Sequence, residues 1–261
     1  MIPNTDALQL FRFSEQRWID KLIEGDVSFS CPGAFIHQAK MTGNNDQGDL
    51  FEGVFARLKY GDTKVTSLRK TLGKDLEIIP DGEYVMLRRK SSKKKPIFCY
   101  YGYTAEELLT ENDVDHPGRM KLKHDIDKRM YSSFAASIDC ALISDSHQFT
   151  QISLQPKPFI DRIKIAFLEN GHSYKMQKID YNFFADETFY IEPTRNYDEL
   201  FYKFPQYDYQ YEARICVTDV SLPTIFDRWT LNIIPLNKDD YEITHVPLYV
   251  ELTVDIMECK N

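Results

Sequence analysis

The chain has 261 residues, of which 43% are hydrophobic, including 17 Phe and 16 Tyr. This aromatic content excludes an intrinsically disordered chain, which lacks the apolar surface needed to offset the entropy cost of ordering. The net charge of −8 argues against a protein that coats nucleic acid with its whole surface, because phosphate binding needs a basic face. No apolar run approaches the ~18 residues that cross a bilayer, so no membrane association is expected.

Cysteine usage and the start of the chain indicate a cytoplasmic protein. The five cysteines are odd in number and far apart in sequence: Cys31, Cys99, Cys140, Cys216 and Cys259. Residues 1–6 lack the charged and apolar regions of a secretory signal, so reduced thiols in a cytosol are expected. Pro and Gly are spread without a shift in composition, which favours a single domain over residues 1–261.

Residues 8–30 predict a strand, a helix and a second strand. The apolar residues of 8–13 are typical of a short strand, and Ser14 is a favourable residue to begin a helix. From Trp18 onward, apolar residues recur at i, i+1, i+4 and i+5, which places them on one helical face. Gly25 follows the last apolar pair, where a left-handed helix end is common, and alternating residues then predict a strand.

The rest of the chain predicts an α+β fold. Glu83–Leu87 and Pro96–Tyr101 are expected to pair as a central hairpin, and residues 118–139 lean toward helix. After residue 149, β-branched and aromatic residues predict a C-terminal antiparallel sheet with strands at Ile163–Leu168, Lys203–Phe204, Tyr209–Val217 and Leu248–Asp255. The expected fold is α+β, with an N-terminal strand–helix–strand, a central hairpin and this C-terminal sheet.

Three segments carry a resemblance: Leu10-Phe11-Arg12-Phe13-Ser14, Asp49-Leu50-Phe51-Glu52, and Lys203 followed by Tyr209-Gln210-Tyr211-Glu212-Ala213-Arg214. Their order resembles an uncharacterised bacterial domain family. That family has an N-terminal Tyr/Phe-Lys/Arg-Tyr/Phe strand, an Asn-Asp-Pro-Phe-Glu loop and a C-terminal Tyr-Glu-x-Glu-x-Arg strand. This chain lacks the proline of the loop, and Ala213 stands between Glu212 and Arg214. The resemblance implies a role in phage–host conflict, including antiviral defence.

The strand bearing Arg12, followed by a helix and a serine-bearing strand, is also similar to the start of the ADP-ribosyltransferase fold. This second resemblance implies that Arg12 holds NAD, that Ser28 or Ser30 lines the nicotinamide pocket, and that Glu212 stabilises the sugar cation. The chemistry suits these residue types, because arginine grips pyrophosphate bidentately and a carboxylate stabilises an oxocarbenium centre. The alternative is that Arg12 lies at the surface and pairs with Asp49 or Glu52.

Further polar residues are candidates for binding. Asp46, Asp49 and Glu52 could hold a hard cation, although Asp49 capping a helix explains the same segment and no metal is expected. Glu212 and Arg214 alternate on one predicted strand, so they share a face, either as an exposed ion pair or lining a cleft. Binding roles are therefore assigned to Asp49, Glu52, Arg214 and Tyr101.

Residues 88–95 hold six Lys and Arg at the tip of the predicted hairpin. Arg88, Arg89, Lys93 and Lys94 beside tyrosines could contact nucleic acid, but a solubilising turn explains them equally. The motifs of zinc hydrolases, P-loop enzymes, α/β-hydrolases and Rossmann oxidoreductases are missing from the sequence.

The leading hypothesis is a conflict protein with an ADP-ribosyltransferase-like site for NAD or a related nucleotide. Its competitors are a non-catalytic protein that sequesters a nucleotide signal or occludes a partner protein, and a protein that contacts nucleic acid through residues 88–95.

Overall fold

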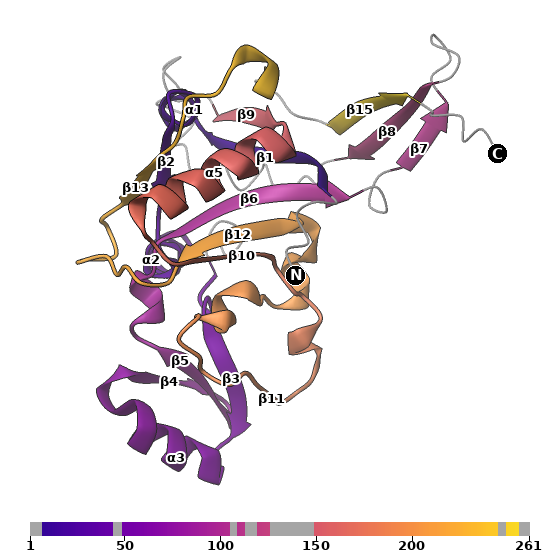
Figure 1. Cartoon of the computed structure of the whole chain (residues 1–261). Coiled ribbons are helices and arrows are strands. Elements are labelled where there is room, and N and C mark those ends of the chain that lie inside the picture. The colour runs from indigo at the N-terminus through magenta and orange to yellow at the C-terminus, as the bar shows by residue number, and fades with distance from the viewer. Residues whose placement is uncertain are drawn as a thin grey trace, which may run out of the picture.

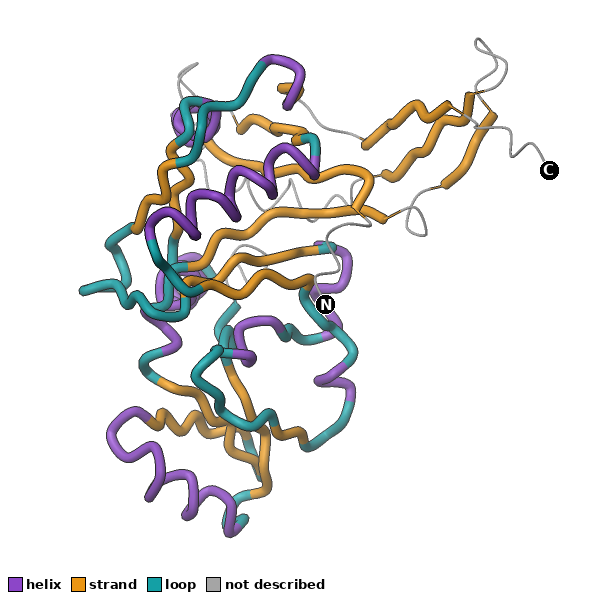
Figure 2. The backbone as a smooth tube through the Cα atoms, in the orientation of Figure 1, coloured by secondary structure: helices purple, strands orange, loops and turns teal. Residues whose placement is uncertain are grey.

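The computed structural model describes residues 7–43, 49–104, 109–112, 119–125, 149–244 and 249–255 (Figures 1 and 2). Its largest element is a six-stranded antiparallel sheet with strand order β10-β12-β6-β1-β9-β14. The strands are β1 Ala7–Glu15, β6 Ile97–Thr104, β9 Phe149–Leu154, β10 Tyr174–Lys178, β12 Glu212–Val217 and β14 Tyr241–Thr244. Helices and antiparallel sheets occur in the same chain, so the predicted α+β class is confirmed.

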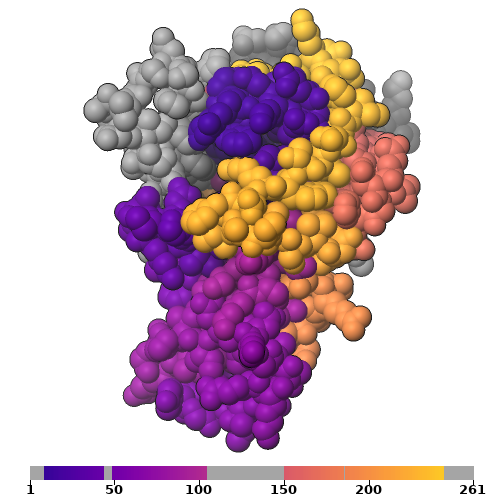
Figure 3. All heavy atoms as spheres, turned by 90° about the vertical axis from the view of Figure 1, so that its left-hand side faces the viewer, coloured from indigo at the N-terminus to yellow at the C-terminus, as the bar shows by residue number. Residues whose placement is uncertain are grey.

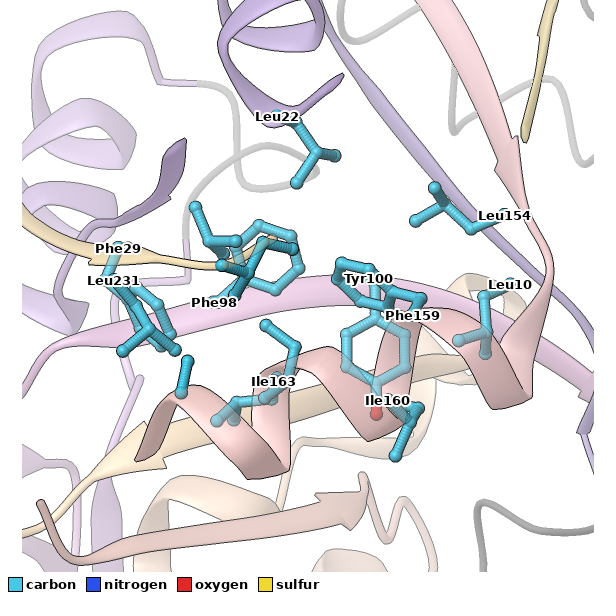
Figure 4. Packing of buried hydrophobic residues seen from close by; sticks show 14 of the residues in the cluster. Leu10, Leu22, Phe29, Phe98, Tyr100, Leu154, Phe159, Ile160, Ile163 and Leu231 are labelled. Carbon is cyan, nitrogen blue, oxygen red and sulfur yellow. The ribbon is translucent and has the colours of Figure 1, made fainter. Parts of the chain in front are cut away.

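Helix α5, Pro156–Asn170, covers one face of this sheet. Its residues Phe159, Ile160 and Ile163 point into a core that also holds Phe98 and Tyr100 of β6 (Figure 4). Burial of one aromatic or branched side chain contributes about 1.5–3 kcal/mol, so this layer accounts for a large part of the stability of the sheet.

The strand predicted at Ile163–Leu168 is wrong, because these residues belong to α5. Pro156 stands at the start of the helix, where its missing N–H costs nothing. The buried positions Phe159, Ile163 and Phe167 recur every four residues, which is helical spacing that extends beyond the predicted strand.

The predicted N-terminal strand–helix–strand is confirmed as β1, α1 Gln16–Ile23 and β2 Asp26–Phe29. The helix begins after Glu15 rather than after Ser14, and no side chain caps it. β2 pairs with β13, Trp229–Asn232, in a separate two-stranded sheet. Helix α2, Pro32–Thr42, follows β2.

Gly25 joins α1 to β2 in a conformation that excludes other residues. Its φ is +100°, and a Cβ atom there would lie 2.3 Å from the carbonyl oxygen of Ile233. Gly25→Ala is therefore expected to lower the free energy of unfolding by about 2–4 kcal/mol, measured by urea denaturation. Gly43→Ala is the matched control, since Gly43 also has a positive φ but open space around it, and its cost is expected near 1 kcal/mol. Equal losses in both variants would contradict the steric argument.

Residues 54–95 and 189–190 build a smaller lobe below the main sheet (Figure 1). Its four strands run in the order β11-β3-β5-β4 and are β11 Phe189–Tyr190, β3 Val54–Lys59, β5 Tyr84–Arg89 and β4 Leu76–Asp81. Helix α3, Thr63–Leu72, connects β3 to β4. Short 3-10 helices lie at Gly73–Asp75, Ser92–Lys94, Phe183–Ala185, Asp198–Phe201, Pro205–Gln210 and Lys238–Asp240.

The structure contains a central hairpin, but other strands form it than those predicted. β5 pairs with β4 and β3, whereas β6 belongs to the six-stranded sheet, so residues 83–87 and 96–101 do not pair with each other. The observed hairpin is β4–β5, which turns at residues 82–83. Residues 88–95 consequently link two sheets instead of forming a tip.

A fourth sheet pairs β7 Leu109–Asn112, β8 Arg119–Asp125 and β15 Tyr249–Asp255. β15 confirms the strand predicted near residues 248–255. The helix expected over residues 118–139 is wrong at its beginning, because residues 119–125 form strand β8. Residues 126–139 lie outside the described part of the chain. Among the described residues, no helix is both long and apolar enough to cross a membrane.

Candidate functional site

Glu212 and Arg214 lie on the same face of β12, as predicted from their alternation. The other face of the strand carries Ala213 and Ile215, which pack in the core beneath α5. Both charged side chains are buried, with 4% of Glu212 and 1% of Arg214 exposed. The exposed-pair alternative is therefore excluded, and these two residues form the centre of a buried charge cluster.

Arg214 connects three segments of the chain. Its Nε donates to Glu212, and its two terminal nitrogens bind the carboxylate of Glu52, 162 residues away in sequence. One of these nitrogens also donates to the carbonyl oxygen of Leu200 at 2.8 Å. The guanidinium group thus fixes the loop before β3 and the segment around residue 200 against β12.

Lys203 completes the cluster from the side opposite Arg214. Its ammonium group lies 2.5 Å from the second carboxylate oxygen of Glu212 and 2.8 Å from the side-chain oxygen of Gln210. Burial disfavours the charged amine, but the neighbouring Glu212 outweighs this effect and raises the pKa of Lys203. Two cations and two carboxylates therefore balance in charge within this cluster.

Asp49 is a third carboxyl group at this cluster. It is 4% exposed, and its Oδ1 accepts a hydrogen bond from the backbone N–H of Phe51 at 2.8 Å. It caps the turn that leads into β3, so the helix expected to begin at Asp49 is wrong. Burial, together with the nearby charge of Glu52, raises the pKa of Asp49 to about 7.

The pKa of Glu212 is shifted in the opposite direction. Burial by itself would raise its pKa, but the positive charges of Arg214 and Lys203 outweigh burial and lower the pKa to about 2. Glu212 therefore stays ionised at every physiological pH, whereas Asp49 exchanges a proton near neutrality. The cluster contains one permanent carboxylate and one titrating carboxyl group.

Aromatic rings lie directly beside the charges. Tyr101 of β6 stands opposite Glu212 in the strand register, and burial together with that carboxylate raises the pKa of Tyr101. Its ring stacks on Phe11 at a centroid distance of 5.4 Å. The ring of Tyr207 lies 5.6 Å from the ammonium group of Lys203. Tyr101, Arg214, Asp49 and Glu52, the four residues assigned binding roles from sequence, are thus brought together around Glu212.

Arg12 does not join this cluster, so the predicted convergence of Arg12, Ser28 and Glu212 is wrong. Phe11, Tyr101 and Glu212 stand opposite one another on adjacent strands and share a face. Arg12 follows Phe11 and therefore points to the other face, where its guanidinium lies 4.4 Å from the ring centroid of Phe98.

The alternative for Arg12, an exposed residue paired with Asp49 or Glu52, is also wrong. The two candidate serines lie apart from the cluster as well. Arg12 donates to the carbonyl oxygen of Cys99 and pairs with neither loop carboxylate. Ser28 pairs with Thr230 in the separate two-stranded sheet, and Ser30 bridges to Ile97. Ile97 precedes Tyr101 by four residues, so Ser30 lies about 13 Å along β6 from the position that faces Glu212.

The basic segment 88–95 supports the cluster from inside the protein instead of forming an exposed tip. Arg88 is buried and donates to the carbonyl oxygens of Leu50 and Glu52 at 3.0 and 3.1 Å, which holds the loop that carries Asp49. Arg89 binds the carboxylate of Glu199 with two nitrogens at 2.7 and 2.6 Å. The same segment thereby positions both loops that contact Arg214.

The partly exposed Lys93 and the exposed Lys94 of this segment are bonded as well. Lys93 pairs with Glu77 at 3.0 Å, and Lys94 donates to the carbonyl oxygen of Pro223 at 2.6 Å. Both interpretations of the segment from sequence, a nucleic-acid contact and a solubilising turn, therefore need correction. The reason is the topology of the chain. Residues 88–95 connect the four-stranded sheet to the six-stranded sheet and are partly buried between them, whereas a hairpin tip would extend into solvent.

Among the described residues, no group of three or more His, Cys, Asp and Glu side chains could hold a metal ion. Asp46, one of the residues considered for a cation, lies outside the described residues. Cys31, Cys99 and Cys216 are free thiols, and Cys140 and Cys259 lie outside the described residues.

Comparisons of the chain with family models, curated proteins and solved structures found no match. The site is therefore interpreted from its own geometry. Sequence reasoning missed Gln210, Glu199 and the supporting role of Arg88 and Arg89. Lys203 was present in the quoted motif, nine residues before Glu212, but no local pattern assigned it a partner.

Proposed function

We propose that this chain is an enzyme that cleaves the N-glycosidic bond of NAD or a related nucleotide at the buried charge cluster. The observation that carries the proposal is the burial of Asp49 and Glu212 in one charge cluster, where only Glu212 is bonded to Arg214 and Lys203, so that the pKa of Asp49 is raised and that of Glu212 is lowered. Enzymes that cleave glycosidic bonds combine one permanently charged carboxylate with one that exchanges a proton. A role in phage–host conflict, implied by the resemblance, belongs to the same proposal.

In the proposed reaction, the bond between C1′ of the ribose and the nicotinamide nitrogen breaks, and its electron pair leaves with the nicotinamide. The carboxylate of Glu212 stabilises the positive charge that develops on the sugar. The oxygen of a water molecule forms the new bond to C1′, and Asp49 in its ionised form accepts the proton that this water loses. Nicotinamide departs as a neutral molecule and needs no proton.

The aromatic rings support a nucleotide as the substrate. Tyr101, the partly exposed ring of this group, lies next to the charges, and stacking of a base on such a ring is worth about 1–3 kcal/mol. Arg12 takes no part in this proposal, because it lies on the other face of the sheet.

The test is release of nicotinamide from NAD by the purified protein, followed by chromatography between pH 5 and 9. The rate is expected to rise with pH and to level off above about pH 7, since the reaction needs ionised Asp49. Glu212→Gln should reduce the rate by about 10²–10³-fold, and Arg57→Gln, which alters an ion pair in the small lobe, should leave it unchanged. A folded protein that neither consumes NAD nor shifts its melting temperature with NAD would refute the proposal.

A non-catalytic binding role is the second candidate, and one observation favours it. The nitrogens of Arg214 and the ammonium of Lys203 already bind groups of the chain itself, so the cluster is saturated without a ligand. A protein that sequesters a nucleotide or occludes a partner protein would bind stoichiometrically, and Glu212→Gln would not abolish that binding. Isothermal titration with NAD and capture of host proteins, each repeated with Glu212→Gln, separate the two candidates.

A further inference from the structure

The small lobe has a charge opposite to that of the rest of the chain. Residues 54–95 and 189–190, which build the lobe, contain 12 Lys and Arg against 5 Asp and Glu, a net charge of +7 in a chain whose total is −8. The remaining residues therefore carry −15. Such an asymmetry within one chain indicates a region that meets a polyanion.

The acidic residues of this lobe are mostly occupied inside it. Asp75 accepts from Ser91, Glu77 pairs with Arg88 and Lys93, and Asp81 pairs with Arg57. Asp62 accepts from the backbone N–H of Lys64 at the start of α3. The positive charge that remains uncompensated therefore lies on the exposed side chains.

Five of these exposed side chains surround α3: Lys59, Lys64, Arg69, Lys70 and Lys74. None of the five takes part in an ion pair with a described residue. Residues 63–72 contain no acid, so no carboxylate lies on the helix itself. Lys64 stands over the ring of Tyr190 at 4.8 Å, which orients its ammonium group but leaves its charge unneutralised.

The two faces of α3 differ sharply. Leu68 is buried, and Val65 and Leu72 pack with it against the sheet of the small lobe. The opposite face carries Thr63, Thr66, Ser67 and Lys70, all of them exposed. Hydroxyl groups and amines on one face are the donors that proteins use to bind phosphate oxygens.

The helix lies at the outer end of the lobe, away from the six-stranded sheet (Figure 1). The lobe projects from the rest of the molecule in the space-filling view (Figure 3). Tyr60, directly before α3, is 81% exposed and offers a ring on which an unpaired base can stack. A membrane surface fits less well, because the apolar face of α3 is used inside the lobe and offers nothing to insert into lipid.

We propose that the exposed surface of α3, including Lys64, Arg69 and Lys70, binds the phosphate backbone of single-stranded nucleic acid without sequence preference, together with Lys59, Tyr60 and Lys74. This surface is distinct from the buried charge cluster and from residues 88–95. Its binding depends on counterion release, so affinity falls steeply with salt.

The experiment measures anisotropy of fluorescent 20-nucleotide DNA and RNA with the full chain between 50 and 200 mM NaCl. With ~5 phosphate contacts, the affinity is expected to fall by roughly 10²-fold over this range. The variant Lys64→Glu/Arg69→Glu/Lys70→Glu should bind at least ~10-fold more weakly and show a shallower salt dependence, while Tyr60→Ala should weaken binding with the salt dependence unchanged.

The matched control is Lys21→Glu/Lys157→Glu/Lys238→Glu, which changes the net charge by the same amount at exposed sites outside the lobe. It should bind nearly as well as the unmodified chain. Equal losses in both triple variants, no binding at 50 mM NaCl, or binding to phosphatidylserine vesicles but not to nucleic acid would each overturn the proposal. All six substituted positions are exposed, so both variants are expected to fold. Circular dichroism of each variant checks this.

Discussion

Replacing Arg214 with Ala is expected to lower the free energy of unfolding by about 3–5 kcal/mol, the largest effect of any single change in the buried charge cluster. The substitution leaves the carboxylates of Glu52 and Glu212 buried without their shared cation, and it removes the donor to the carbonyl oxygen of Leu200. Urea denaturation monitored by tryptophan fluorescence measures the change. In a chain of this size such a loss lowers the melting temperature by roughly 10 °C.

The control for this prediction is Arg57→Ala, which removes a partly exposed ion pair with Asp81 and should cost about 0–1 kcal/mol. A second variant, Glu52→Leu/Lys203→Met/Glu212→Leu/Arg214→Met, replaces the four paired charges with apolar groups of similar size. Replacing a complete buried ion network in this way is often neutral or stabilising. If this apolar variant stays stable yet loses activity, the cluster is a functional centre. A small effect of Arg214→Ala on stability would contradict the burial of the Arg214 side chain among its carboxylate partners.

Replacing Asp49 with Asn is expected to have opposite effects on stability and activity. The pKa of Asp49 is about 7 in the folded chain and near 3.8 when it is unperturbed, so the folded state binds the proton more tightly. Stability therefore falls as pH rises from about 4 to about 7, because ionising Asp49 opposes folding. The neutral Asn keeps the oxygen that accepts from Phe51, and it should raise the free energy of unfolding by about 2–4 kcal/mol at pH 8.

The stability gain of Asp49→Asn should become small near pH 4, where Asp49 is protonated in the folded chain and partly protonated in the unfolded chain. Denaturation at pH 4, 6 and 8 tests this dependence. The rate of NAD cleavage should fall by about 10²–10⁴-fold at pH 8, because the proton acceptor is lost. A variant that is equally stable at all three pH values would show that Asp49 does not titrate near neutrality, and unchanged activity would remove it from the reaction.

The local elements of this protein follow from its sequence to a large extent. Alternating apolar residues and the glycine at position 25 predict the first strand, helix and second strand, because each depends on neighbours within a few residues. The shared face of Glu212 and Arg214 follows from the two-residue period of a strand. Even so, the strand predicted at Ile163–Leu168 is wrong, because these residues belong to the helix Pro156–Asn170 and a short apolar run fits both a strand and a helix.

The candidate site depended on contacts between segments far apart in the chain. Glu52 and Arg214 are separated by 162 residues, and no local pattern predicts that they meet. The face to which Arg12 points was decided by the pairing of β1 with β6, which strand periodicity alone does not provide. Residues 88–95 show the same limit, because the charge of a segment is a property of the sequence, whereas its burial depends on which sheets it connects. Sequence thus determined the residue types and their short-range spacing, and the tertiary structure decided which charges are buried together, because their desolvation and pairing arise only when the layers pack.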